Sequence, residues 1–245
     1  MEDTRNDGGL RRPELRLSAT LLFAGVLVSL LAGLRHPDAA SANDHTATFA
    51  EYAASDAWIA VHLGQFLGMA LLICGLLVLA FALNVRHGAA AWGVRVGAAA
   101  AITALALYGV LQGVDGVALK HAVDAWAGAA EGEKALRFAA AEDIRWLEWG
   151  VRSYQSFMLG SALILFGIAI AATRRVSRFI GYLMVLSGAA YLVQGWIIGA
   201  EGFSASNSLP TLFGIVLVVG WTGWLLVAAW RGNGRGKAGA QASAG

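Results

Sequence analysis

The chain contains six apolar stretches, each long enough to cross a lipid bilayer as a helix. A helix needs about 20 mostly apolar residues to span the hydrocarbon layer. The stretches cover residues 17–34, 57–83, 92–119, 148–172, 179–199 and 209–230. They are continuous rather than alternating, which favours helices over the strands of a membrane barrel. The sequence therefore predicts an all-α polytopic membrane protein with a six-transmembrane-helix bundle.

The composition supports this prediction and narrows the expected partners. Hydrophobic residues make up 58% of the 245 residues and charged residues only 14%, which is far too apolar for an ordinary soluble domain. The single cysteine, Cys74, excludes an intramolecular disulfide and a cysteine-based metal site. Because no phosphate-binding loop or aromatic-rich basic patch is present, we expect no nucleic-acid partner. The expected partner is the lipid bilayer, and a homo-oligomer or another membrane partner is compatible with the sequence.

The distribution of positive charge predicts how the chain crosses the membrane. With a cytoplasmic N-terminus, twelve of the 18 Lys and Arg residues fall on the cytoplasmic side. They are Arg5, Arg11, Arg12, Arg16, Arg86, Arg95, Arg174, Arg175, Arg178, Arg231, Arg235 and Lys237. Short cytoplasmic loops carry such an excess, so both termini are expected in the cytoplasm. Most acids and four of the five histidines then lie toward the outside, where we expect any chemistry.

One membrane domain, residues 17–230, is predicted between a cytoplasmic N-terminal tail at 1–16 and a disordered cytoplasmic tail at 231–245. The first apolar stretch also resembles a signal peptide, because an A-x-A sequence at 40–42 follows it. The length of the stretch, and the charged residues at 35–38 that separate it from that sequence, favour a retained first span.

The connection at residues 120–147 is Ala-rich, mixed in charge and bounded by Trp126, Trp146 and Trp149. This pattern predicts a helix that lies at the membrane interface, and a plain solvated helix is the alternative. Several pairs of glycines at i, i+4 predict close approaches between spans. They are Gly64 and Gly68, Gly93 and Gly97, Gly109 and Gly113, and Gly195 and Gly199.

Polar residues gather near the outer ends of spans 2 to 5. At 100° per residue, Tyr108, Gln112 and Asp115 share one side of span 3. The other spans contribute His62 and Gln65 (span 2), Glu148, Arg152 and Gln155 (span 4), and Gln194 (span 5). The pattern predicts one polar pocket that opens outward between spans 2 and 5, with spans 1 and 6 as flanks.

A charge within the hydrocarbon costs about 2.5–3.5 kcal/mol, so such a residue normally faces a partner or a cavity. Arg152 is the expected partner of Asp115, and Glu148 precedes Arg152 by four residues, in the favourable order for an ion pair. Two interpretations remain open: an ion pair that only fixes helix packing, or a pair completed by a ligand or ion.

Metal and cofactor chemistry is less strongly indicated. His62, His121, Asp115 and Glu148 are suitable ligand types at one depth, and His62 with His121 is the one histidine pair that could hold a haem. No metal-ligand spacing or haem-attachment motif accompanies these residues. We therefore expect no bound cofactor, with a metal or a haem as the alternatives.

The sequence resembles a family of bacterial six-span membrane proteins of unknown function that is common in actinobacteria. The resemblance rests on a Pro-bearing loop after span 1, on "AWIAVHLGQFLG" in span 2 and on "RRVSRFIGYLMVLSGAAYL" in span 5. It implies six helices and a multi-pass location in the bacterial plasma membrane, and it assigns no catalytic residue.

These observations give three functional hypotheses. The first is binding of a small polar solute, lipid headgroup or ion at the residues named above, for sensing, accessory binding or transport. The second is a metal-dependent membrane enzyme that uses His62, His121 and nearby acids. The third is a structural or accessory membrane subunit, whose glycine-rich faces pack against a partner.

Overall fold

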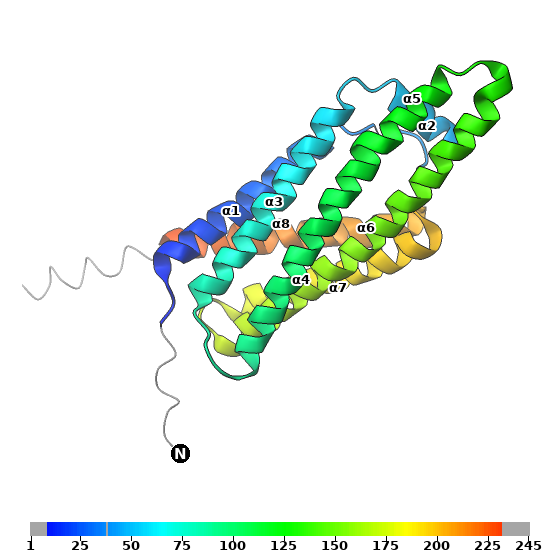
Figure 1. The fold of residues 1–245 in the computed structure, drawn as a ribbon. Helices are drawn as coiled ribbons and strands as arrows, with labels where there is room; N and C mark the ends of the chain where they lie inside the picture. Colours follow the sequence, from blue (N-terminus) through cyan, green and yellow to red (C-terminus); the bar gives the residue numbers. More distant parts are fainter. Residues whose placement is uncertain (1–8, 38, 232–245) are drawn as a thin grey trace, which may run out of the picture.

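The computed structural model describes residues 9–37 and 39–231, and these residues contain no strand. The elements in chain order are α1 (Arg12–Gly33), α2 (His45–Ala53), α3 (Trp58–Leu83), α4 (Gly88–Gly113), the π-helical segment η1 (Val114–Leu119), α5 (Lys120–Ala127), α6 (Glu131–Thr173), α7 (Arg178–Glu201), the short 3₁₀ segment η2 (Ala205–Asn207) and α8 (Ser208–Arg231) (Figure 1). The predicted disordered tail lies, apart from Arg231, outside the described residues.

Six helical segments are long and apolar enough to cross a membrane. They include the uninterrupted runs Gly88–Ala127 and Glu131–Thr173. Large apolar side chains point outward along the helices, as in Leu63, Phe81 and Trp196, which are 66%, 67% and 73% exposed. Such an apolar exterior suits contact with lipid rather than water. The predicted all-α, six-span fold is confirmed.

Helix α6 and the helical run Gly88–Ala127 are much longer than a bilayer requires. Their length corrects the expectation of an interfacial helix at residues 120–147. At about 1.5 Å per residue, α6 with its 43 residues measures roughly 65 Å, about twice the thickness of the hydrocarbon layer. Residues 131–147 therefore continue the fourth span in one helix instead of lying flat as a separate interfacial helix. With α5 they form a hairpin that projects beyond the other helices (Figure 1).

We call α2, α5 and residues 131–147 of α6 the cap. A small apolar core joins them to the adjoining helices, and it consists of Phe49, Tyr52, Trp58, Leu119, Val123 and Ala141. The ammonium group of Lys120 donates hydrogen bonds to the carbonyls of Tyr52 and Ala53, both at 3.1 Å. These carbonyls end α2, where a cation is favoured by the helix dipole. The cap is thus docked by both apolar burial and charge.

We call the opposite end of the bundle the arginine end. There, residues 84–87 join α3 to α4 and residues 174–177 join α6 to α7. The helices α3 and α6 end there in left-handed residues, Asn84 and Arg174. Arg175 donates hydrogen bonds to the carbonyls of Leu83 and Asn84. This side chain therefore ties the two connections together.

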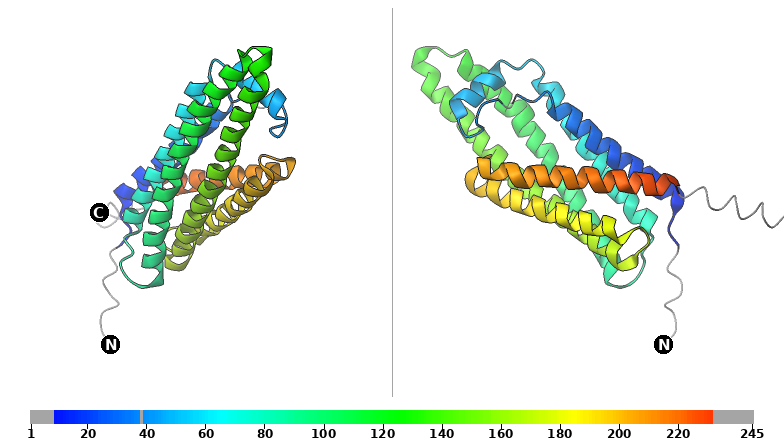
Figure 2. Two further views of the ribbon diagram at one scale, coloured as in Figure 1. Left: turned by 45° about the vertical axis from the view of Figure 1, so that its right-hand side comes forward. Right: turned by 180° about the vertical axis from the view of Figure 1, so that it is seen from behind.

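Helices α1 and α8 meet at the arginine end and separate toward the cap. The guanidinium group of Arg16 on α1 donates to the carbonyl of Ala229 on α8 at 3.3 Å, so these helices touch near the arginine end. The two views in Figure 2 show α8 diverging from α1 toward the other end. A continuous apolar core of Leu, Ile and Ala fills the bundle on the arginine side. The widening is therefore confined to the cap side.

Helices α6 and α7 approach each other through glycine. A Cβ on Gly167 would lie 2.6 Å from the carbonyl oxygen of Gly181, and one on Gly160 would lie 2.7 Å from that of Gly188. Real Cβ atoms do not approach a carbonyl this closely, so any larger residue would push the helices apart. Hydrophobic association is weak between helices in lipid, so this close backbone contact is a main source of attraction.

We predict that Gly167→Ala and Gly160→Ala each lower the free energy of unfolding by about 1–3 kcal/mol, the usual penalty of overpacking. Gly150→Ala on the same helix is the matched control, because a Cβ there has no neighbour within 4 Å. The measurement is thermal unfolding of the detergent-purified protein. Equal melting temperatures for the three variants would contradict this packing.

Candidate functional site

A cavity of about 400 Å³ lies on the cap side of the bundle, where α8 has separated from α1. Its wall is formed by Gly33, His36, Ala42, Tyr52, Gln65, Tyr108, Leu111, Gln112, Asp115, Arg145, Glu148, Arg152, Phe203, Thr211 and Ile215. The wall thus combines two carboxylates, two guanidinium groups and several neutral polar groups. Such a concentration of polarity within a helical membrane bundle normally marks a functional region.

Five of the eight predicted binding residues line this cavity: Gln65, Gln112, Asp115, Glu148 and Arg152. The other three, His62, Gln155 and Gln194, are buried behind the wall. The flanking spans contribute more than the sequence predicts. Gly33 of α1 and both Thr211 and Ile215 of α8 reach the cavity, because α1 and α8 bound its widening side.

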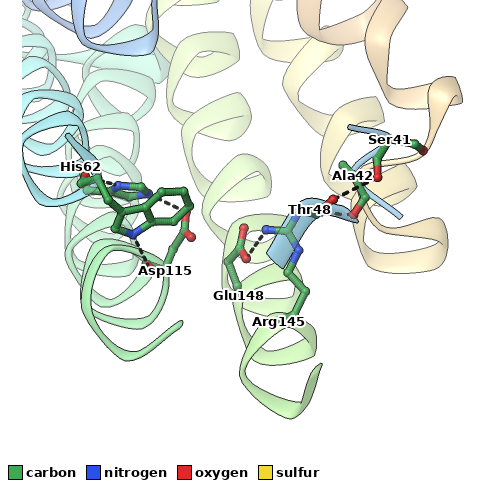
Figure 3. Close-up of polar contacts among 8 residues, drawn as sticks. Ser41, Ala42, Thr48, His62, Asp115, Arg145 and Glu148 are labelled. Carbon is green, nitrogen blue, oxygen red and sulfur yellow. Dashed lines mark hydrogen bonds and ion pairs between the residues drawn. The ribbon is translucent and has the colours of Figure 1, made fainter. Parts of the chain in front are cut away.

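Asp115 is held toward α3 by a short chain of hydrogen bonds. One carboxylate oxygen, Oδ2, lies 3.0 Å from Nε2 of His62, and Nδ1 of the same ring lies 2.7 Å from the carbonyl oxygen of Trp58 (Figure 3). The indole N–H of Trp58 donates at 3.1 Å to the carbonyl oxygen of Asp115. The π-helical segment η1 carries Asp115, and such segments often occur at functional sites.

The expected ion pair between Asp115 and Arg152 is wrong. Among the described residues these two side chains do not come within 4.0 Å of each other, and Asp115 pairs with His62. The physical reason is the π-helical turn with its two contacts to α3, which directs the carboxylate toward that helix. The two residues nevertheless face the same cavity.

Glu148 pairs with Arg145 rather than with Arg152. The two groups are 2.6 Å apart, and both residues are 2% exposed (Figure 3). Arg145 also lies over the rings of Tyr52, Trp149 and Phe203, at 5.5, 5.7 and 5.1 Å from their centroids. Aromatic faces attract a cation that has lost its water, so this cage helps to hold the guanidinium within the protein.

Arg145 is the residue that sequence analysis missed, although a signal was present. Positions 145, 148, 152 and 155 follow one another at i, i+3, i+7 and i+10, a single stripe along one helix. Placing the start of the fourth span at residue 148 assigned Arg145 to the surface connection. Sequence analysis also did not group His36 with His62 and Asp115, because His36 lies in the loop after α1, where no periodicity relates it to the helices.

Arg152 is the one guanidinium in the cavity wall that lacks a carboxylate partner among the described residues. Its Nη1 donates to the amide oxygen of Gln155 at 3.3 Å, and its guanidinium carbon lies 5.9 Å from the ring centroid of Tyr108. The wall therefore presents a guanidinium group that has no carboxylate within 4.0 Å among the described residues.

The buried glutamines hold the helices behind the cavity. Gln194 on α7 accepts from the hydroxyl of Ser156 at 3.1 Å and donates to the hydroxyl of Thr211 at 2.7 Å, which links α6, α7 and α8. Gln155 accepts from Arg152. Both residues therefore position cavity residues rather than facing the cavity themselves.

Among the residues of the cavity wall and Gln155 behind it, four buried polar atoms have no hydrogen-bond partner among the described residues. They are Gln112 Oε1, Asp115 Oδ1, Arg145 Nε and Gln155 Nε2. Buried polar groups are nearly always paired, because leaving one unpaired costs about 1–3 kcal/mol. Two of the four atoms, Gln112 Oε1 and Asp115 Oδ1, are hydrogen-bond acceptors on residues of the cavity wall.

The predicted metal and haem ligands are not assembled as expected. His121 is exposed on α5 and does not join His62, because the sidechain of residue 121 lies on the outer face of that helix. The group of potential ligands that does converge in the described part of the chain is His36, His62 and Asp115. The histidine pair on which the haem alternative depended is therefore not formed.

We predict that Arg145→Met and Glu148→Gln each destabilise the protein by about 3–5 kcal/mol, because either one leaves a buried charge without its partner. The double variant Arg145→Met/Glu148→Gln should lose less than the sum of the two. Arg137→Gln and Glu133→Gln are the controls, since that pair lies on the same helix with side chains 51% and 61% exposed. Additive losses, measured by thermal unfolding, would contradict a coupled buried pair.

Comparisons with known proteins add a family to this description. Neither the curated proteins nor the solved structures provide a match to the chain. A family model described as "Domain of unknown function (DUF4386)" matches residues 18–229. This range includes every residue of the cavity wall and all six spans, apart from the outermost residues of the first and the last. The chain is a helical membrane protein that belongs to the DUF4386 family.

Proposed function

We propose that the protein binds a small polar molecule with an anionic group in the cavity between α8 and the other helices, and that Arg152 binds the anionic group. One observation carries this proposal: Arg152 faces the cavity and has no carboxylate partner among the described residues, whereas Arg145 and Glu148 neutralise each other. A charge at this depth is unfavourable unless a counter-charge or water accompanies it. An anion bound beside Arg152 would supply that counter-charge.

The rest of the wall favours a ligand with more than one polar group. Gln112 Oε1 and Asp115 Oδ1 are acceptors without a partner among the described residues, so they would accept hydrogen bonds from the ligand. The volume of about 400 Å³ is in the usual range of small-molecule sites. Carboxylate and phosphate groups are the anions that a guanidinium binds best, because its planar fork matches them.

The packing favours binding over passage through the membrane. Transport requires a second opening at the other end, and the bundle between the cavity and the arginine end is filled by closely packed residues such as Leu72, Leu76 and Leu163. Within the described residues, the polar side chains of the cavity wall are not continued through this core. We therefore propose a sensing or accessory binding role in preference to transport.

The orientation in the bacterial plasma membrane is part of the proposal. The arginine end carries Arg86, Arg174 and Arg175, so the positive-inside rule places it in the cytoplasm. The cap and the cavity then face outward, and the ligand would arrive from the outside or from the outer leaflet.

We predict that inorganic phosphate or acetate, compared with chloride at equal ionic strength, raises the melting temperature of the purified protein. Arg152→Gln should weaken the affinity for the effective anion by about 10–100-fold, as expected for the loss of a charge-assisted hydrogen bond. Arg137→Gln, which removes an exposed arginine from the same helix, should leave the affinity unchanged.

A lipid headgroup carries the same chemistry, so a second arm separates the two sources. The wild type and both variants are compared in nanodiscs of phosphatidylcholine with and without phosphatidylglycerol. Stabilisation by phosphate or acetate that depends on Arg152 identifies a free solute as the ligand. Stabilisation by phosphatidylglycerol that depends on Arg152 identifies a lipid headgroup. The absence of any Arg152-dependent effect in both arms would overturn the proposal.

The orientation predicts a labelling pattern. In a Cys74→Ala background, a membrane-impermeant maleimide added to intact spheroplasts should label Gly132→Cys in the cap and not His87→Cys at the arginine end. Both positions are exposed, so accessibility to the reagent depends on the side of the membrane. The reverse pattern would show that the cavity faces the cytoplasm.

A further inference from the structure

We propose that His36, His62 and Asp115 bind one divalent transition-metal ion at the edge of the cavity. Three separate elements supply the ligands: His36 follows α1, His62 is on α3 and Asp115 is in η1. One ligand atom from each lies within 4.8 Å of the other two. The convergence of two imidazoles and a carboxylate from distant parts of the sequence is the observation from which the proposal starts.

The hydrogen bonds of His62 point to a cation between His62 and Asp115. Its Nδ1 lies 2.7 Å from the carbonyl oxygen of Trp58, which can only accept, so this nitrogen donates. In a neutral ring Nε2 then carries a lone pair, and it faces the Asp115 oxygen at 3.0 Å. Two lone pairs cannot attract each other at this distance. A proton or a metal ion must lie between them.

The contact with Trp58 is the one that a metal-binding histidine typically makes. Such a histidine usually donates its second ring N–H to a carbonyl or carboxylate, which fixes the ring and directs the other nitrogen at the metal. Trp58 itself is 1% exposed and also binds the backbone of η1. The ring of His62 and the π-helical turn that carries Asp115 are thus held by one residue.

The third ligand is on a segment that can adjust. Bonds of about 2.0–2.1 Å at tetrahedral angles place neighbouring zinc ligands roughly 3.3 Å apart. His62 Nε2 and Asp115 Oδ2 are already 3.0 Å apart, so it is His36 that must approach, by at most about 1.5 Å. His36 lies in the connection after α1, with its ring centroid 5.5 Å from that of His62. A small shift of this loop completes the site without moving a helix.

The ligand set selects the class of ion. Imidazole favours zinc, cobalt, nickel or iron over magnesium and calcium, which prefer oxygen ligands. Three protein ligands leave a coordination position open, as in sites where an ion binds water or substrate. Asp115 and Arg152 line the same cavity. An anionic ligand on the open coordination position would therefore lie in the cavity that Arg152 faces.

The metal site shares Asp115 with the proposed anion site, but the two can fail separately, because none of the three metal ligands is Arg152. The test uses protein whose affinity tag has been removed and which has been treated with chelator. Zinc is added in isothermal titration calorimetry, and cobalt is added in a parallel absorption measurement, since cobalt bound at a nitrogen-containing site gives visible bands. We expect about one ion per chain for the wild type.

His121→Ala is the matched control, because it removes an exposed histidine of the cap and should leave binding unchanged. His36→Ala, His62→Ala and Asp115→Asn should each lower the affinity by at least about 100-fold, as expected when a ligand is lost. His36→Ala changes a loop residue and Asp115→Asn preserves shape, so these two variants should stay folded without metal. Arg152→Gln should lose the anion effect and keep the metal.

Three results would overturn the metal site. One is a wild type that takes up no zinc or cobalt. A second is a His36→Ala variant that binds as tightly as the wild type while its melting temperature without metal is unchanged. The third is a loss of binding in His121→Ala, which would assign the metal to the cap surface. In the first case the His62–Asp115 contact is held by a proton alone.

Discussion

The hydrocarbon of a bilayer cannot solvate charge, and this constraint explains the arrangement of polar residues in the protein. Glu148 and Arg145 are almost completely buried, and each is stable there because the other neutralises it. The aromatic cage around Arg145 adds to this balance. Arg152 has no such carboxylate partner among the described residues, and it faces the cavity. Local neutralisation thus separates the buried ion pair that holds the fold from Arg152, the group to which we assign ligand binding.

The cavity exists because α8 packs against α1 at the arginine end and leaves it toward the cap. Glycine contacts bring α6 and α7 together, and an apolar core fills the bundle toward the arginine end. Toward the cap, α8 leaves α1, and the space between them is bounded by polar residues of α3, α4 and α6. Helix α2 of the cap borders this region, and Lys120 of α5 holds α2 in place through two hydrogen bonds. Packing on one side of the bundle and docking of the cap on the other therefore define one polar compartment.

Helical periodicity in the sequence predicted the polar side of the bundle, because long apolar helices leave few alternatives for Gln112, Asp115 and Glu148. It could not predict which side chains pair with Asp115 and Glu148. The π-helical turn of η1 departs from 100° per residue, so the direction of the Asp115 side chain could not be calculated from its position. The length of α6 was hidden by its change from polar to apolar composition, which concealed Arg145. His36 lies in a loop, and only the tertiary structure brings it to His62.

The central claim is that the polar side chains on the cap side face a compartment that polar molecules enter. In a Cys74→Ala background, the rate at which a charged methanethiosulfonate reagent modifies Gln112→Cys tests this most directly. Val110→Cys is the comparison, because Val110 lies on the same helix and is 54% exposed on the apolar exterior. The account predicts much faster modification of Gln112→Cys. Equal rates, or faster modification of Val110→Cys, would contradict it.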